Sequence, residues 1–296
     1  SSDYLPLRVD YEEKFYAAGK IIGSRYIRRE SRPSDEAILA GRLVDRTVRP
    51  LFNSRLRRDI QIVVTVLEID EENDPEFVGL IGASIALGIS DIPWGGPVAG
   101  VRVVQLGSEF KINPNNSEVL ASQGQAKPAF DAFVAGSHDR INMLELTGDD
   151  AREKDVIHGF SLAQKEINKL IEFQKEIIKE IGKPKTEGAL AEIDPALKAA
   201  VEKFLDGRLE AAIYQPTKQE HYGKLGELKK ELFAHVKESF AEPNYKAVDF
   251  LFEEMINDIV HENILEKEKR PDGRKLDQVR ELNGEVGLFP RTHGSA

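Results

Sequence analysis

An arginine-rich segment at residues 23–34 holds the side chains with the clearest chemical potential in this sequence. It runs Gly-Ser-Arg-Tyr-Ile-Arg-Arg-Glu-Ser-Arg-Pro-Ser, so Tyr26 precedes the adjacent Arg28 and Arg29, and Arg32 follows them. A guanidinium group binds phosphate oxygens in pairs, and an aromatic ring provides a surface for base stacking. The segment also ends where a helix is predicted to begin, and helix N-termini attract anions. This combination favours binding of a phosphate chain with a base stacked nearby.

Three more arginines recur on the helix that is predicted to follow Ser34. Arg42, Arg46 and Arg49 have the spacing that places them on one helical face. Like charges at this spacing repel by roughly a few tenths of a kcal/mol per pair unless an anion or an acid compensates them. Asp45 offsets part of this repulsion through Arg49. From these residues alone, a solvated or internally paired basic face is as good an interpretation as an anion site.

The distribution of charge matters more here than its total. The 296 residues carry a net charge of −10, yet ten arginines between Arg25 and Arg58 outnumber four acids and leave a local +6. Because charge is segregated along the chain, the acidic total does not exclude a nucleic-acid partner.

Composition excludes several classes of site and location. The chain has no cysteine, which rules out disulfides, thiolate nucleophiles and cysteine-bound zinc, and its six histidines lack metal-ligand spacing. It also lacks the roughly 20 consecutive apolar residues of a membrane span and shows no secretory signal. We therefore expect a cytoplasmic protein without a metal site or a membrane partner.

Two other groups of polar residues are weak candidates for catalysis. Asp149 and Asp150 stand where a long helix is predicted to start, a position at which acids usually act as caps. His293 and Ser295 are close in sequence, but no acidic residue is evident to orient the histidine. We expect no catalytic residue in this chain.

The first half of the chain is predicted to mix strands with helices. A helix should begin after Ser34 and stop near Pro50, and a second, rich in small residues, should span 74–90. Strands are predicted at 5–10, 60–69, 129–135 and 142–146, with a hairpin of 98–106 and 109–112 that turns at Gly107. This pattern is typical of an α+β layered fold.

The second half is predicted to be helical. A long helix opens at Asp149 and ends at Gly182, and helical segments follow at about 194–213, 217–238 and 245–268. The sequence Arg-Pro-Asp-Gly-Arg at 270–274 predicts a turn, and a further β-type segment is expected at 286–289.

Several motifs in order resemble those of the bacterial polynucleotide phosphorylase family. Near the start they are Asp-Tyr-Glu-Glu-Lys-Phe-Tyr-Ala-Ala-Gly-Lys at 10–20, then Arg28-Arg29-Glu30 with Arg-Pro-Ser at 32–34. Further motifs lie at 42–46, 49–52, 81–84, 92–97, 270–274 and 288–296. The resemblance covers essentially the whole chain.

The resemblance implies a ring-shaped homotrimer that threads single-stranded RNA and takes part in mRNA degradation, with a degradation complex as a possible partner. Members of the family are exoribonucleases that work from the 3′ end by phosphorolysis. They use inorganic phosphate to release nucleoside diphosphates, act in reverse as nucleotidyltransferases, and are assisted by Mg²⁺ in a catalytic domain. A non-catalytic RNA-binding ring subunit of an exosome-like complex is the alternative.

The resemblance also divides the chain. Residues 1–148 would form a first RNase PH-like domain, with the fold of ribosomal protein S5 domain 2 and with its front strands missing, which leaves an exposed sheet edge. Residues 149–185 would be a long helix closing that domain, 186–269 an all-helical linker domain, and 270–296 the start of a second, catalytic RNase PH-like domain.

The same resemblance assigns roles to individual residues. Arg28 and Arg29, together with Tyr26 and Arg32, would contact RNA, whereas Arg42, Arg46 and Asp131 would line a vestigial anion or phosphate pocket. Asp131 keeps the acid of the family's Asp-x-Lys arrangement, but Phe133 stands where the active copy has lysine. Because a phenyl ring cannot bind phosphate, the first domain is expected to be catalytically silent.

Overall fold

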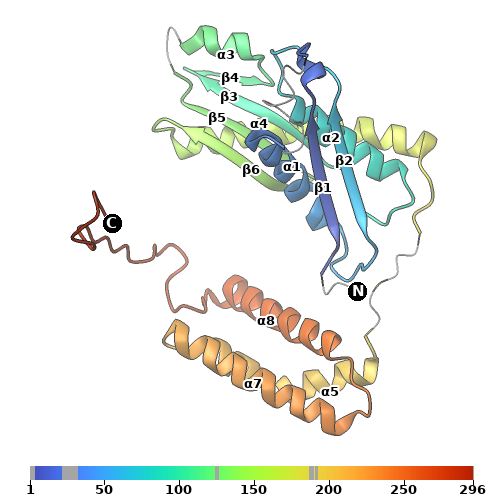
Figure 1. The fold of residues 1–296 in the computed structure, drawn as a ribbon, viewed down its shortest axis with the longest axis vertical. Coiled ribbons are helices and arrows are strands. Elements are labelled where there is room, and N and C mark those ends of the chain that lie inside the picture. The colour runs from blue at the N-terminus through green and yellow to red at the C-terminus, as the bar shows by residue number, and fades with distance from the viewer. Residues whose placement is uncertain (1–3, 22–32, 124–126, 187–189, 191–192, 296) are drawn as a thin grey trace. The chain divides into compact units, whose positions relative to one another are not determined.

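The computed structural model describes residues 4–21, 33–123, 127–186, 190 and 193–295. The chain forms two units, residues 1–190 and 191–296, which are described separately (Figure 1).

The first unit contains a two-stranded parallel sheet with a helix between its strands in sequence. Strand β1 (Leu7–Glu13) pairs with β2 (Ile60–Val66) in a register that aligns Leu7 with Ile60. The 3-10 helix η1 (Phe15–Ala18) follows β1. Parallel strands need a crossover connection, which helix α1 (Asp35–Val48) and η2 (Arg49–Leu51) supply. Both strands were predicted, although β1 lies further along the chain than expected.

The start of α1 is fixed by a cap that the sequence predicted. The Ser34 hydroxyl accepts a hydrogen bond from the Ala37 amide at 2.9 Å and donates one to the Glu13 carboxylate at 2.7 Å. Asp35 and Glu36 occupy the first turn, where acids favour the helix dipole. The cap therefore also ties α1 to the end of β1.

Four antiparallel strands form the second sheet, in the order β4-β3-β5-β6. The strands are β3 (Ala99–Leu106), β4 (Glu109–Ile112), β5 (Phe130–Gly136) and β6 (Ile141–Gly148). The predicted hairpin of β3 and β4 is confirmed, and Gly107 at its turn has a φ of +61°, which suits glycine.

Helices cover this sheet from two sides (Figure 1). Helix α4 (Glu153–Ile181) packs on one face through Ala163, Ile167 and Ile171, and its Gly159 lets the helix approach because a Cβ there would lie 2.7 Å from the Phe130 ring. On the other face a separate core joins the sheet to α1, to helix α2 (Pro75–Ile89) and to the parallel strands. A short helix, α3 (Asn116–Gln123), precedes β5.

Strand β5 therefore has two differently occupied faces. Its residues Phe130, Ala132 and Val134 belong to the α4 core, whereas Phe133 and Ala135 belong to the opposite core. Asp131 is two residues before Phe133 on the strand, so its side chain lies on the same face as Phe133.

The second unit consists of helices α5 (Pro195–Leu205), α6 (Arg208–Ile213), α7 (Lys218–Ser239) and α8 (Tyr245–Lys267). The helical content was predicted, but one expected helix at 194–213 is divided into α5 and α6. Gly207 between them has a φ of +67°, outside the range of a continuing helix. Leu209, Leu232 and Leu251 are among the residues of the common core.

The segment after α8 corrects one prediction and confirms another. The expected β-type segment at 286–289 is wrong, since the described residues of this stretch form no strand and Val286 is 87% exposed. Without a neighbouring strand its amides bond locally, as Gly287 does to the Ser295 carbonyl. The turn at 270–274 is confirmed: the Arg274 and Arg270 side chains bind Asp272 and hold the pKa of its carboxyl at about 2.

Candidate nucleic-acid interface

The four predicted RNA-contact residues, Tyr26, Arg28, Arg29 and Arg32, lie outside the described residues. The residues that flank them are described, and both flanks are fixed near the end of β1. On one side the Lys20 amide donates to the Phe15 carbonyl at 2.9 Å, and on the other Ser34 bonds to Glu13. The arginine-rich segment is thus connected to the body of the unit at two neighbouring points.

A cavity of about 1260 Å³ lies beside β1 and α1 and is bordered by both flanks of the segment. Its lining includes the whole of β1, one side of α1 and part of the loop before α2. Three of its cations are engaged: Arg8 with Asp10 at 2.9 Å, Lys14 with Glu12 at 3.2 Å, and Arg49 with Asp45 at 2.6 Å.

Arg42 differs from these engaged cations. It is exposed on α1, it lines the cavity, and within the described part of the chain it has no carboxylate partner. A free guanidinium at the edge of a cavity can accept an anion from outside the protein. This geometry suits the predicted contact of Arg42 with phosphate.

The three residues of the predicted anion pocket lie in different surroundings. Arg42 lines the cavity, whereas Arg46, also exposed on α1, and Asp131 are not among its lining residues. The Asp131 carboxylate is taken by the Arg102 side chain, at 2.6 Å from Nη2 and 2.9 Å from Nε. A joint role of the three in binding an anion stays a prediction.

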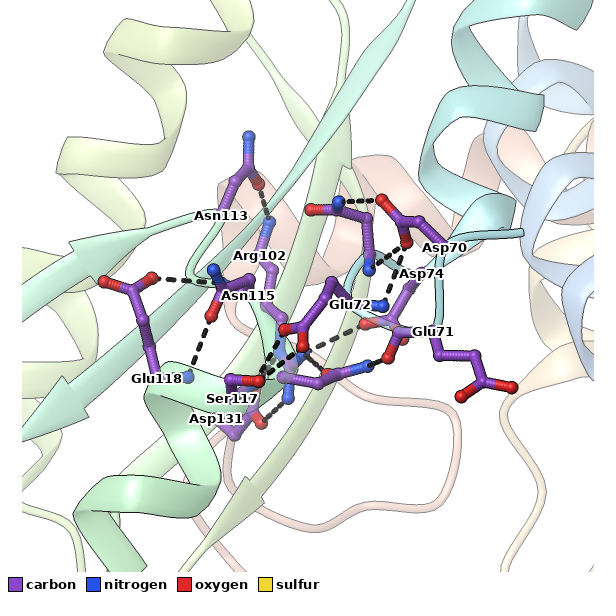
Figure 2. A network of polar contacts seen from close by, with 12 residues as sticks. Asp70, Glu71, Glu72, Asp74, Arg102, Asn113, Asn115, Ser117, Glu118 and Asp131 are labelled. Atoms are coloured by element: carbon purple, nitrogen blue, oxygen red, sulfur yellow. Dashed lines mark hydrogen bonds and ion pairs between the residues drawn. The ribbon is translucent and has the colours of Figure 1, made fainter. Parts of the chain in front are cut away.

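Arg102 is the centre of a polar network that sequence reasoning missed (Figure 2). Its Nη1 also donates to Asp74 at 2.9 Å and to Asn116 at 3.1 Å, while its amide donates to Asn113 at 2.8 Å. Hydrogen bonding to Asp131 raises the pKa of the guanidinium further above its ordinary value. The signal in the sequence was a single arginine within the otherwise apolar strand Ala-Gly-Val-Arg-Val-Val.

Acids of the loop before α2 complete the network. Asp70 accepts hydrogen bonds from the amides of Glu72 and Asn73, each at 2.9 Å, and Glu72 bonds to the Ser117 amide at 3.1 Å and to its hydroxyl. These bonds hold the loop against the start of α3, and Figure 2 shows Asp70 and Glu72 turned toward these partners. The network therefore serves structure, because the carboxylates of Asp70, Glu72, Asp74 and Asp131 are already hydrogen-bonded.

Phe133 occupies an apolar position beside Asp131. Its ring is 5% exposed and stacks on Phe77, with the ring centres 4.5 Å apart and the planes 12° from parallel. A Cβ at Gly100 would lie 2.3 Å from the Phe133 ring, so the neighbouring strand closes over it. The position therefore offers a substrate phosphate neither a cation nor a hydrogen-bond donor.

Tyr11, a residue of β1 that lines the cavity, has a buried hydroxyl group. Its side chain is 5% exposed, and its hydroxyl has no hydrogen-bond partner among the described residues. Burial raises the pKa of this hydroxyl, and Glu76, whose own pKa is raised by burial, adds to the effect.

We expect Tyr11→Phe to increase the free energy of unfolding by about 1 kcal/mol, because a buried hydroxyl without a partner is unfavourable. Urea unfolding at neutral pH measures the change, and Tyr16→Phe, at an exposed tyrosine, is the control. A loss of stability in Tyr11→Phe alone would show that the hydroxyl is hydrogen-bonded in solution.

No three histidine, aspartate or glutamate side chains among the described residues gather closely enough to hold a metal ion. None of the described helices is both long enough and apolar enough to cross a membrane.

Each of the two units matches a family model of known proteins. The family model of the 3′ exoribonuclease family, domain 1, matches residues 1–93, which confirms the predicted RNase PH-like α+β fold. The model of the polyribonucleotide nucleotidyltransferase RNA-binding domain matches residues 196–275, within the helical unit. Among solved structures, rice Rrp46 is similar with a TM-score of 0.45 at 11% identity, over 60% of this chain and 74% of that one.

Curated relatives align along almost the whole chain. The polyribonucleotide nucleotidyltransferase of Heliobacterium modesticaldum is 39% identical over 293 residues, which is 99% of this chain and 40% of the relative. Those of Thermomicrobium roseum and Brevibacillus brevis are each 41% identical over 99% of this chain, which corresponds to 38% and 41% of their lengths. The chain thus spans about 40% of these relatives' length. The two family models match in order and the relatives align with 99% of this chain, so the chain matches about two fifths of a polyribonucleotide nucleotidyltransferase along almost its whole length.

Proposed function

We propose that this chain is the RNA-holding part of a phosphate-dependent 3′-to-5′ exoribonuclease, a polyribonucleotide nucleotidyltransferase that releases nucleoside diphosphates from single-stranded RNA. The observation that carries the proposal is the alignment of 99% of the chain, at 39–41% identity, with proteins of that name. The same alignment favours this function over that of a non-catalytic subunit of an exosome-like ring.

The first unit contributes binding rather than chemistry. Asp131 is engaged by Arg102, and Phe133 is buried. The proposal therefore assigns phosphorolysis, with inorganic phosphate and Mg²⁺, to the part of the enzyme that this chain does not span.

The proposal extends to domains and assembly. Residues 1–148 and the helix at 149–185 form the silent RNase PH-like domain, 186–269 the helical linker domain, and 270–296 the entry to the catalytic domain. The enzyme is a cytoplasmic homotrimer around an RNA channel and acts in mRNA degradation, in which a degradation complex is a further partner. The family resemblance supports this arrangement.

Local geometry supports RNA contact at the arginine-rich segment. Both of its flanks are hydrogen-bonded near Glu13, and beside them Arg42 presents a guanidinium that has no carboxylate partner among the described residues. Anchored ends reduce the entropy that a segment loses when it binds a ligand. Tyr26, Arg28, Arg29 and Arg32 are the residues proposed to touch RNA.

Replacing Arg28 and Arg29 together by alanine is expected to weaken RNA binding. Each phosphate contact on single-stranded RNA contributes about 0.7 to the slope of log affinity against log salt, so the slope should fall by about 1.4. Fluorescence anisotropy with labelled oligoadenylate over a salt series measures this slope. The control is Arg140→Ala with Arg280→Ala, which removes the same charge at exposed positions. An equal change of the slope in both double variants would show that Arg28 and Arg29 have no specific role in RNA binding.

A further inference from the structure

Helix α7 separates its charges onto two neighbouring faces. Its acids Glu220, Glu227, Glu231 and Glu238 recur at intervals of seven, four and seven residues, which align along one stripe. Lys230 and Lys237, also seven residues apart, lie along another. The buried face, which includes Leu228, Leu232 and Val236, belongs to the core of the helical unit.

The two stripes differ in how their charges are satisfied. Glu227 pairs with Lys224 at 2.9 Å, Glu231 pairs with Arg208, and Glu220 accepts a hydrogen bond from the Thr217 hydroxyl at 2.8 Å. Within the described chain, neither Lys230 nor Lys237 has a carboxylate partner. Three of the four acids are thus engaged inside the unit, whereas these two lysines remain available to an anion from outside.

An exposed aromatic ring and a third lysine lie toward the start of the same helix. Tyr222 is 63% exposed, and the Lys218 ammonium lies 5.9 Å from the centre of its ring. No carboxylate partner is recorded for Lys218 among the described residues. At about 1.5 Å per residue, Tyr222 and Lys237 are about 22 Å apart along the helix, a length that suits an extended ligand.

The surface between these side chains is smooth. Gly223 and Gly226 lie in the interior of α7, where glycine is less favourable than alanine, and a Cβ at either would meet no atom within 4 Å. Packing within the helical unit therefore does not require glycine at these positions. Their effect is to let an external backbone approach the helix between Tyr222 and Lys230.

We propose that this face of α7, formed by Tyr222, Gly223, Gly226, Lys230 and Lys237 and here called the lysine face, is an RNA-contact surface of the helical unit. The lysines neutralise phosphates of a single strand, and the Tyr222 ring stacks on a base. Lysines without a carboxylate partner among the described residues, next to an exposed ring, complement RNA, in a unit whose family model describes an RNA-binding domain. The inference rests on the proposed function and adds to it a second contact, distinct from the arginine-rich segment.

The test compares Lys230→Ala with Lys237→Ala, made together, against Lys224→Ala with Lys198→Ala. Both double variants lose two positive charges, but Lys224 and Lys198 already pair with Glu227 and Glu202. With labelled oligoadenylate and the full chain, the salt slope of binding should fall by about 1.4 for the first variant and change little for the control.

A second pair of substitutions separates binding from folding. Gly223→Gln with Gly226→Gln should raise the melting temperature by several degrees, because glutamine is a better helix former, and should also weaken RNA binding by blocking close approach. A higher melting temperature with unchanged RNA affinity would overturn the role of the lysine face.

Other outcomes also decide the matter. If the arginine variants weaken binding but the lysine variants match their control, the inference fails and the proposed function stands. If the unaltered chain does not bind oligoadenylate, the proposed function itself fails. If the lysine variants change only the sedimentation of the chain, the surface contacts protein and the inference is wrong.

Discussion

Phe133→Lys is expected to destabilise the first unit by at least about 3 kcal/mol and to produce no phosphorolytic activity. Replacing a buried phenylalanine by a small residue already costs about 3–5 kcal/mol, and an ammonium group buried in the same place adds a desolvation cost. The stack on Phe77 is lost as well. Urea unfolding measures the change in stability, and nucleoside diphosphate release in the presence of phosphate measures activity.

Phe173→Lys is the matched control, because Phe173 is an exposed phenylalanine on α4. It should leave the unfolding transition nearly unchanged. A stable Phe133→Lys variant that releases nucleoside diphosphates would show that the first unit retains a working site in which only the lysine is missing.

Arg102→Met is expected to lower the free energy of unfolding by about 2–3 kcal/mol. Methionine retains much of the side-chain length but leaves Asp74 and Asp131 without their shared cation, and breaking a partly buried pair costs more than removing a surface one. Chemical denaturation again provides the measurement. The loop before α2 should also become more accessible to hydrogen exchange, because Arg102 joins it to β3 and β5.

A double-mutant cycle shows how much of the stability lost in Arg102→Met comes from the ion pair with Asp131. If Arg102 and Asp131 act as a pair, Arg102→Met in an Asp131→Asn background should cost less than in the unaltered chain. Arg152→Met, at an exposed arginine, controls for the loss of one charge. Equal costs in both backgrounds would contradict the role given to the ion pair.

Local signals account for the parts of the fold that the sequence predicted. Ser34 with two acids after it identifies a helix start without reference to other parts of the chain, and Gly107 identifies a hairpin turn in the same way. Helix α3 lacked such a signal, since few of its eight residues are apolar. The pairing of β1 with β2 joins strands more than 40 residues apart in sequence, and no local pattern specifies it.

The wrong prediction at 286–289 has the same origin. Alternating apolar residues favour a strand only when a neighbouring strand can bond to them, and the described residues offer none. The division of the helix at 194–213 was in principle visible, because Asp206 and Gly207 interrupt its apolar pattern.

The candidate site was predictable only in part. The resemblance to a known family identified Asp131 and Phe133, and the structure shows why the second cannot act on phosphate. Arg102 was missed because its partners come from three separate segments, which only the folded chain brings together. The arginine-rich segment stays a prediction that rests on residue types and on the family resemblance.

The most direct test of the account uses the purified chain with single-stranded RNA, inorganic phosphate and Mg²⁺. RNA binding is followed over a salt series, and nucleoside diphosphates are measured in the same samples. The account predicts weak, salt-dependent binding without release of nucleoside diphosphates. Phosphate-dependent release by this chain alone would contradict the claim that it holds RNA without a phosphorolytic site of its own.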